Sequence, residues 1–290
     1  MSAARVVVKA FAKINLGLRI VGKRPDGYHE IETLFQSIDL FDIVHLEPAE
    51  EQKIYLEITS PWTLPTGREN LVYRAAELVL ARAGARGGVR IHLEKRIPVG
   101  AGLGGGSSDA AATLVGLNAL FELRFDDAQL HALARELGSD VPYFLIGGLC
   151  RGRGRGEVLT RLAPKLQNYQ FLLVRPDCSL ATEAVYRQYD ALVEQGWRPA
   201  PPRFFKDIDC VNDLEEAASM LCPALRALAH TVAQLHPELW GMSGSGPTYY
   251  AGWHSAPPIS VNDLAQMGYS VLWVRPTERG HELVEEATMH

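Results

Sequence analysis

The segment from Pro98 to Ser108 carries the strongest chemical signal in the sequence. Five of the seven residues at 100–106 are glycines, so the backbone there can turn tightly and expose several N–H groups. A helix predicted over 109–120 follows directly, and its first turn adds free N–H donors and the positive end of the helix dipole. A loop and helix of this kind form a phosphate-binding site. The predicted phosphate-binding residues are Pro98, Val99, Gly100, Ala101, Gly102, Leu103, Gly104, Gly105, Gly106, Ser107 and Ser108.

Two common nucleotide-binding templates do not describe this loop. Its Gly-x-Gly-x-x-Gly spacing matches the dinucleotide fingerprint, which also needs an acidic residue about 20 positions on, at the end of a second parallel strand. Glu122 lies near that distance but follows a helix. The Walker A pattern needs a lysine after its last glycine, where this chain has Ser107. The hydroxyls of Ser107 and Ser108 stand at the mouth of the helix, where they could contact phosphate oxygens or a magnesium ion.

Lys13 and Asn15 are polar residues within an apolar strand. Residues 6–18 are strand-like, which places Lys13 and Asn15 on one face and Ile14 and Leu16 on the other. A lysine and an amide side by side can bind and stabilise anionic groups. The simpler alternative is a half-exposed strand that carries an ordinary surface lysine.

Asp140 is the candidate general base. It follows a helix predicted over 126–137 and ended by Gly138, and Pro142 suits the first turn of another helix. Its simpler role is therefore a helix N-cap. Both roles are compatible, because a helix N-terminus and a nearby lysine keep such a carboxylate ionised.

Two further segments combine residue types that suit ligand binding. Tyr28 and His29 follow a Pro-Asp-Gly turn at 24–27, although an aromatic residue and a histidine are also ordinary at the start of a strand. Ser243 and Gly244 begin a second glycine-rich bend near the C-terminus. This bend lacks the Gly-x-Ser-x-Gly order of a serine-hydrolase elbow, so we expect it to lie beside the phosphate loop.

Composition excludes several classes of protein. The chain has 290 residues, with 29 Lys and Arg against 34 Asp and Glu, a net charge of −5 that disfavours nucleic acid as a partner. It contains no apolar run of 18 residues and no secretory signal, so we expect no membrane partner and a cytoplasmic protein. The four cysteines lack the spacing of a zinc site, which predicts free thiols and no protein-bound metal.

The elements that must position these residues alternate along the chain. In the first half we expect strands over 6–18, 28–38, 43–46, 54–59 and 89–97, and helices over 70–83, 109–120 and 126–137. In the second half we expect strands over 169–174, 240–251 (with a central turn) and 269–274, and helices over 182–192, 213–235 and 261–267. This pattern predicts an α+β fold with an N-terminal lobe over 1–160 and a C-terminal lobe over 161–290.

Several of these segments, taken in order, resemble the GHMP kinases, which are named after galactokinase, homoserine kinase, mevalonate kinase and phosphomevalonate kinase. The three family motifs are Ala12-Lys-Ile-Asn-Leu16, the loop from Pro98 to Ser108, and Ser243-Gly-Ser-Gly-Pro247. Three more strings are similar to the branch that acts on a cytidine diphosphate-linked sugar alcohol, and they are Arg24-Pro-Asp-Gly-Tyr-His-Glu30, Gly138-Ser-Asp-Val-Pro142 and Asn212-Asp-Leu-Glu215. The resemblance covers nearly the full length.

The resemblance implies an activity and a catalytic pair. The activity is phosphorylation by ATP, accompanied by Mg²⁺, of the 2-hydroxyl of a cytidine diphosphate-linked methylerythritol, in the non-mevalonate route to isoprenoid precursors. Asp140 would be the base for that hydroxyl. Lys13 would keep Asp140 ionised and help to stabilise the developing charge. The glycine-rich loop would wrap the ATP phosphates. These roles agree with the chemistry of phosphoryl transfer, which is mostly positioning and charge stabilisation.

The same resemblance implies binding roles and a fold. Asn15 would position the substrate, and Tyr28 and His29 would bind its cytosine end. Ser243 and Gly244 would support the phosphate loop. The N-terminal lobe would have a fold like that of ribosomal protein S5, and the C-terminal lobe a ferredoxin-like fold, which together make the two-lobed GHMP kinase fold.

Some features leave alternatives open. Arg151, Arg153 and Arg155 would share one face of a strand, either as an exposed edge or as a positive field for a diphosphate-bearing substrate. No motif identifies a magnesium ligand; Asp109 is a candidate, but its position at a helix start has a simpler structural explanation. The oligomeric state is not predicted.

Three other functions compete with this reading. Another kinase of the family, of the homoserine or mevalonate type, should lack Tyr28 and His29 after the turn. A dinucleotide-dependent oxidoreductase would need the missing acidic residue. A non-catalytic RNA-binding protein is suggested by the expected lobe and the Arg-Gly run, but the negative net charge and the Lys13 and Asp140 pair oppose it.

Overall fold

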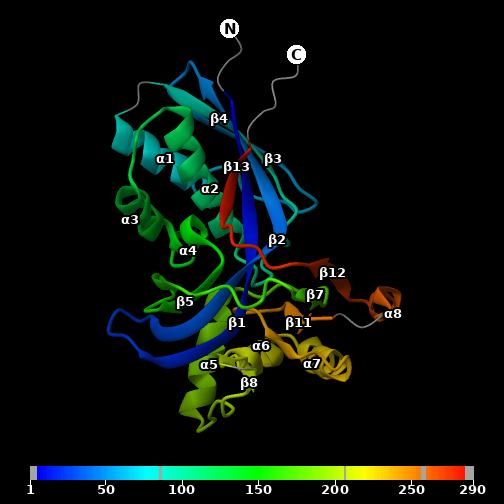
Figure 1. Cartoon of the computed structure of the whole chain (residues 1–290). Helices are drawn as coiled ribbons and strands as arrows, with labels where there is room; N and C mark the ends of the chain where they lie inside the picture. The colour runs from blue at the N-terminus through cyan, green and yellow to red at the C-terminus, as the bar shows by residue number, and fades with distance from the viewer. Residues whose placement is uncertain (1–4, 85–86, 206, 256–258, 285–290) are drawn as a thin grey trace.

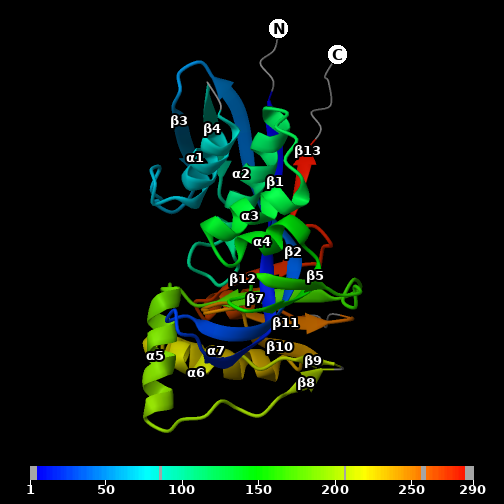
Figure 2. The same ribbon diagram turned by 90° about the vertical axis from the view of Figure 1, so that its left-hand side faces the viewer.

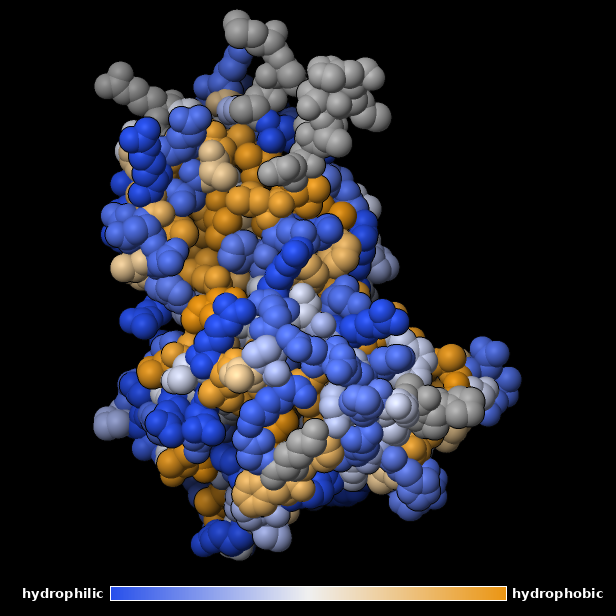
Figure 3. Space-filling view, viewed as in Figure 1, coloured by the Kyte–Doolittle hydropathy of each residue, from blue (hydrophilic) through white to orange (hydrophobic). Residues whose placement is uncertain are grey.

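The structure of this chain is a computed structural model that describes residues 5–84, 87–205, 207–255 and 259–284. In Figure 1 it divides into an upper and a lower part, each with its own sheet and helices. Seen from the same side as a space-filling surface, apolar residues gather over the upper part (Figure 3). The α+β class predicted from the sequence is confirmed.

The upper part is built on a sheet of seven strands within the described residues. Its main path has the order β13-β1-β2-β4-β3, and β5 pairs with both β2 and β6. Four helices lie on one side of this sheet, as the two ribbon views agree (Figures 1 and 2). The strands are β1 (Val6–Lys23), β2 (His29–Ala49), β3 (Ile54–Thr59), β4 (Gly88–Glu94), β5 (Leu149–Arg153), β6 (Val158–Arg161) and β13 (His281–Val284). The helices are α1 (Leu71–Ala83), α2 (Gly105–Leu120), α3 (Asp127–Leu137) and α4 (Val141–Ile146).

The lower part is built on an antiparallel sheet of order β10-β11-β7-β12, with a short β8-β9 pair beside it. Helices α5, α6 and α7 pack on this sheet around a second apolar core. The strands are β7 (Gln170–Arg175), β8 (Phe204–Phe205), β9 (Ile208–Asp209), β10 (Leu239–Met242), β11 (Tyr249–Trp253) and β12 (Ser270–Val274). The helices are α5 (Thr182–Glu194), α6 (Glu215–Leu221), α7 (Ala224–Gln234) and α8 (Val261–Gln266).

Small residues let α2 approach the upper sheet closely. The alanines at 110–112 are fully buried. A Cβ atom on Gly116 would lie only 2.2 Å from a methyl group of Leu46 on β2, so no larger residue fits there without movement. This packing fixes the N-terminus of α2, and with it the glycine-rich loop, against the strands that carry the polar residues.

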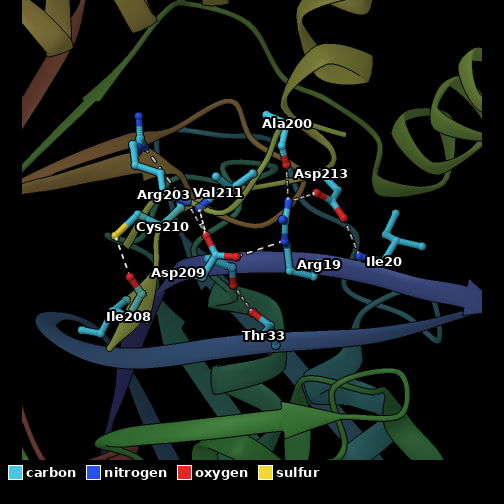
Figure 4. A network of polar contacts seen from close by, with 11 residues as sticks. Arg19, Ile20, Thr33, Ala200, Arg203, Ile208, Asp209, Cys210, Val211 and Asp213 are labelled. Carbon is cyan, nitrogen blue, oxygen red and sulfur yellow. Dashed lines mark hydrogen bonds and ion pairs between the residues drawn. The ribbon is translucent and has the colours of Figure 1, made fainter. Parts of the chain in front are cut away.

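A polar network ties β1 to the lower part (Figure 4). The guanidinium of Arg19 forms ion pairs with Asp209 at 3.0 Å and with Asp213 at 2.6 Å, and Asp213 also accepts the backbone N–H of Ile20 at 2.8 Å. A Cβ atom on Gly17 would lie 1.9 Å from the carbonyl oxygen of Asp209, so glycine is required for this approach. The network therefore holds the strand of Lys13 in register with the lower part.

Local signals predicted several elements well. The helix predicted over 70–83 is α1, which the side chain of Asn70 caps by accepting the N–H of Val72, and which ends at Gly84 in the left-handed conformation. The strand predicted over 54–59 has the bounds of β3.

Other elements differ from the prediction. The strands expected over 28–38 and 43–46 are one continuous strand, β2, which stays paired with β1 through residues 39–42 by means of a register shift. Helix α2 begins at Gly105 rather than at 109. The helix expected over 213–235 divides at Pro223 into α6 and α7, since proline cannot donate the helical hydrogen bond.

The sequence does not predict strand β13, which connects the end of the chain with the first of the two predicted lobes. It follows the lower sheet in sequence but pairs with β1, so residues 281–284 complete the upper sheet. The boundary at residue 160 stays a prediction.

Candidate active site

A cavity of about 1090 Å³ gathers most of the predicted site residues. Its wall includes Lys13 and Asn15 of β1, the loop from Pro98 to Ser107, and Asp140 at the start of α4. Residues from α5 line another part of the wall. The remaining predicted residues that line it are Tyr28, His29 and Gly244.

Ser108 differs from this prediction. Its side chain is fully buried, and its hydroxyl donates a hydrogen bond of 2.6 Å to the carbonyl oxygen of Phe11. Its backbone N–H donates to the carbonyl oxygen of Gly104. Because α2 begins earlier than predicted, Ser108 lies inside the first helical turn rather than at its mouth, and Ser107 is the serine that faces the cavity.

Lys13 lies at the meeting point of three polar groups. Its ammonium donates to the carbonyl oxygen of Gly102 at 2.9 Å and to the side-chain oxygen of Asn15, and it lies 3.6 Å from a carboxylate oxygen of Asp140. The residue is only 3% exposed, so the surface-lysine alternative is wrong. Burial lowers the pKa of Lys13 below its ordinary value, and the Asp140 carboxylate offsets part of that shift.

The carboxylate of Asp140 is open to the cavity. Asp140 stands at the N-cap position of α4, but its side chain makes no capping hydrogen bond, so the predicted capping role is not present. Its side chain is 34% exposed. One oxygen faces the Lys13 ammonium, which leaves the carboxylate able to accept a proton from a bound hydroxyl group.

Ser243 links the strand, the loop and the C-terminal bend. Its hydroxyl accepts the backbone N–H of Asn15 at 3.0 Å and donates to the carbonyl oxygen of Gly102 at 2.9 Å. The side-chain amide of Asn212 holds the bend by donating to the carbonyl oxygens of Met242 and Gly244, at 2.8 and 2.7 Å. The three segments that stand far apart in the sequence therefore meet around the Lys13 ammonium.

Glycine is required at two points of the loop. Gly102 and Gly104 have φ angles of +73° and +72°, which residues with side chains rarely adopt. A Cβ atom on Gly102 would lie 2.1 Å from the carbonyl oxygen of Ser243, and one on Gly104 would lie 2.7 Å from the ring of Phe144. The loop therefore approaches both neighbouring segments as closely as a bare backbone allows.

His29 is held in one orientation at another part of the cavity. Its Nε2 lies 2.7 Å from a carboxylate oxygen of Asp190, and its ring lies 5.0 Å from that of Tyr186 on α5. Burial alone would raise the pKa of Asp190, but hydrogen bonds from Lys23 and His29 outweigh burial and lower it. The ionised carboxylate can only accept, so Nε2 of His29 carries the donated proton. By contrast, Tyr28 is 55% exposed at the rim.

A buried charge cluster lies behind the loop. The Lys95 ammonium forms ion pairs with Asp42 and, at 2.7 Å, with Asp109. Burial would lower the pKa of Lys95, but these two carboxylates raise it. The second oxygen of Asp109 has no hydrogen-bond partner in the described residues. Two carboxylates face the one ammonium, so a negative charge is left over, and Asp109, which also lines the cavity, stays the candidate magnesium ligand.

Comparison with known proteins identifies the family. Residues 70–148 match the model of the GHMP kinases N terminal domain. The 4-diphosphocytidyl-2-C-methyl-D-erythritol kinase of Caldicellulosiruptor saccharolyticus is 41% identical over 84% of this chain and 87% of its own length. That of Thermoanaerobacter pseudethanolicus is 34% identical over 97% of this chain and 99% of its own length. This chain belongs to that family of GHMP kinases.

Solved structures agree with the assignment. A crystal structure of 4-(cytidine 5'-diphospho)-2C-methyl-D-erythritol kinase is 36% identical, with a TM-score of 0.71 over 93% of this chain and 99% of that chain. A homoserine kinase from Cytophaga hutchinsonii has a TM-score of 0.70 at 19% identity, over 98% of both chains. The two-lobed GHMP kinase fold expected from the sequence is confirmed, and the protein is a small-molecule kinase. Among the described residues, no helix has both the length and the apolar character needed to span a membrane.

The rate of this kinase should fall at high pH because Lys13 loses its proton. The pKa of Lys13 lies below its ordinary value of 10.5. In a plot of kcat against pH, we therefore expect kcat to fall on the basic side with a midpoint below 10.5. Replacing Asp140 with Asn removes the charge that raises the Lys13 pKa. The residual activity of this variant should therefore fall at a still lower pH. Measuring ADP release from pH 7 upward tests this. A rate that stays level to pH 10.5 would contradict it.

Proposed function

We propose that this kinase transfers the terminal phosphoryl group of ATP to the 2-hydroxyl of 4-diphosphocytidyl-2-C-methyl-D-erythritol, giving the 2-phosphate and ADP. The reaction belongs to the non-mevalonate route to isoprenoid precursors. The relatives that match over most of this chain carry the name of this enzyme. One structural observation carries the proposal furthest: a carboxylate paired with a buried ammonium lies in the same cavity as a glycine-rich loop and a fixed histidine.

The proposed reaction uses Asp140 as the base. As the 2-hydroxyl oxygen forms its bond to the γ-phosphorus, its proton passes to the Asp140 carboxylate, and the bond from the γ-phosphorus to the bridging oxygen of ADP breaks. Lys13 forms an ion pair with Asp140 before the transfer and offsets negative charge during it. Asn15 accepts a hydrogen bond from Lys13 and so holds the ammonium in place.

The loop is proposed to bind the phosphates of ATP. The backbone at 100–106, which includes the first residues of α2, lines the cavity and offers N–H groups beside the positive end of the helix dipole. Mg²⁺ is expected to arrive with ATP and to neutralise charge on its phosphates. Asp109, which lines the cavity and has one carboxylate oxygen without a partner among the described residues, would be the protein ligand for that ion, and no step is assigned to the ion.

Tyr28 and His29 are proposed to bind the cytosine end of the substrate. The exposed ring of Tyr28 offers a stacking surface, and His29, whose Nε2 is held by Asp190, has its other ring nitrogen, Nδ1, for a hydrogen bond with the base. A site built from fixed polar groups rejects analogues that leave those groups unpaired.

The test is ADP release from Mg-ATP with a panel of acceptors. Turnover is expected with the cytidyl substrate and not with homoserine, with mevalonate or without an acceptor. Turnover with homoserine or mevalonate instead would keep the kinase and overturn the proposed substrate. No turnover with any acceptor would overturn the proposed function.

A further inference from the structure

Five cationic side chains line the cavity, and they fall into two groups. Lys13, Lys23 and Lys95 each form an ion pair with an aspartate. Within the described part of the chain, the guanidinium groups of Arg155 and Arg187 have no carboxylate oxygen within 4.0 Å. An unpaired guanidinium at the wall of a cavity retains its full charge for an anionic ligand.

Arg155 stands in a turn that is fixed to β2. The backbone N–H of Gly154 donates to the side chain of Glu30 at 3.1 Å, and the carbonyl oxygen of Gly154 accepts the N–H of Ile31 at 2.7 Å. On the other side of Arg155, a Cβ atom on Gly156 would lie 3.8 Å from a carboxylate oxygen of Asp140. The turn that carries Arg155 is therefore anchored directly beside the proposed base.

The guanidinium of Arg155 also reaches the proposed cytosine end. It lies over the ring of Tyr28, with 4.7 Å between the guanidinium carbon and the ring centroid. A stacked guanidinium keeps its N–H groups free at its edges, where they can donate to two oxygens of one phosphate. Arg155 thus lies between Tyr28, which is proposed to stack on the cytosine, and Asp140, which is proposed to accept the proton.

The other two arginines of the run do not share this position. The hypothesis that Arg151, Arg153 and Arg155 lie on one strand face holds only for the first two, because β5 ends at Arg153. Arg151 and Arg153 lie beside Glu32, at 3.9 and 3.3 Å, and neither lines the cavity. Any effect on substrate binding should therefore come from Arg155 alone.

We propose that Arg155 binds the diphosphate group of the nucleotide-linked substrate. The inference rests on the proposed function, in which the diphosphate joins the cytidine at one end to the methylerythritol at the other. A group in the middle of that substrate lies between Tyr28 and Asp140, and the contacts of the turn place Arg155, an unpaired cation, there.

The test compares Arg155→Gln with Arg153→Gln, a matched control from the same run of arginines. Binding of CDP and of cytidine is measured by calorimetry for each variant and for the unaltered protein. We expect Arg155→Gln to weaken CDP binding by about tenfold or more, as for the loss of a charge-assisted hydrogen bond, and to leave cytidine binding within about twofold. The KM for the cytidyl substrate should rise in parallel, with kcat and the KM for ATP little changed. Arg153→Gln should alter none of these.

Each other outcome has a definite meaning. Equal weakening of CDP and cytidine would mean that Arg155 only supports Tyr28, and it would overturn the proposal, as would unaltered CDP binding in Arg155→Gln. Arg155→Lys, which keeps a positive charge, should recover part of the CDP affinity and so separate charge from folding. Failure of the unaltered protein to bind CDP or cytidine would instead overturn the proposed function, and the assignment of Arg155 would fall with it.

Discussion

Replacing Asp140 with Asn should lower kcat by about 10²–10⁴-fold, the usual contribution of a general base. Asn has the same size and cannot take the proton of the attacking hydroxyl group. It also removes the negative charge that lies 3.6 Å from the Lys13 ammonium. Both KM values should change little, because the substitution removes an interaction that acts mainly in the transition state. Steady-state ADP release measures these constants.

Asp127→Asn is the matched control for this prediction. Asp127 is an exposed aspartate in the first turn of a helix, as Asp140 stands at the start of one, but it does not line the cavity. Its substitution should leave kcat unchanged. The Asp140 variant should keep the thermal midpoint of the unaltered protein within a few degrees, because its side chain makes no capping bond and the Lys13 ammonium keeps its acceptors on Asn15 and Gly102. A kcat within about twofold of normal would show that Asp140 is not the base.

The second large effect is expected from Gly102→Ala. The new Cβ atom would lie 2.1 Å from the carbonyl oxygen of Ser243 and 3.0 Å from that of Gly246, and both atoms belong to the backbone, so neither can rotate away. Separation of the loop from the bend would also shift the carbonyl oxygen that Lys13 contacts at 2.9 Å. A displacement of about 1 Å at a reacting group can cost about 10²-fold in rate, so we expect a loss of that order in kcat.

Gly268→Ala is the control variant that separates the effect of this clash from the effect of backbone strain. Gly268 also has a positive φ, +87°, but nothing lies within 4 Å of the position of its Cβ atom. Both variants should lose about 1–2 kcal/mol of stability from the left-handed conformation. The clash should cost Gly102→Ala about 1–3 kcal/mol more, measured as the free energy of unfolding in urea. Equal stability and equal activity of the two variants would contradict the contact between the loop and the bend.

Elements with local signals were predictable from the sequence. The cap at Asn70 and the glycine at Gly84 set the bounds of α1, and Asp126, at the start of the helix predicted over 126–137, forms a reciprocal pair of capping hydrogen bonds with Gln129. Strand β13 carries no such signal. It is four residues long and exists because it pairs with β1, a partner more than 270 residues earlier in the chain.

The residues of the candidate site also fall into two groups: those that sequence motifs predict and those that only the fold brings together. The glycine-rich loop, Lys13 and Asp140 stand in motifs that are visible along the chain. Asp190 lies in the middle of α5 with no local pattern to mark it, and only the fold brings it to His29. Ser108 differs from the prediction because α2 begins four residues before the predicted start: glycines favour loops, yet Gly105 and Gly106 are already helical here.

The most direct test of the central claim is the proton-coupled ³¹P spectrum of the product made from ATP and the cytidyl substrate. The 2-carbon of the methylerythritol carries a methyl group and no hydrogen atom. A phosphate on the 2-hydroxyl should therefore give a new monoester signal without three-bond splitting by a carbon-bound proton. A split signal would place the phosphate on another hydroxyl group. Either that result or the absence of a new monoester would contradict the proposed reaction.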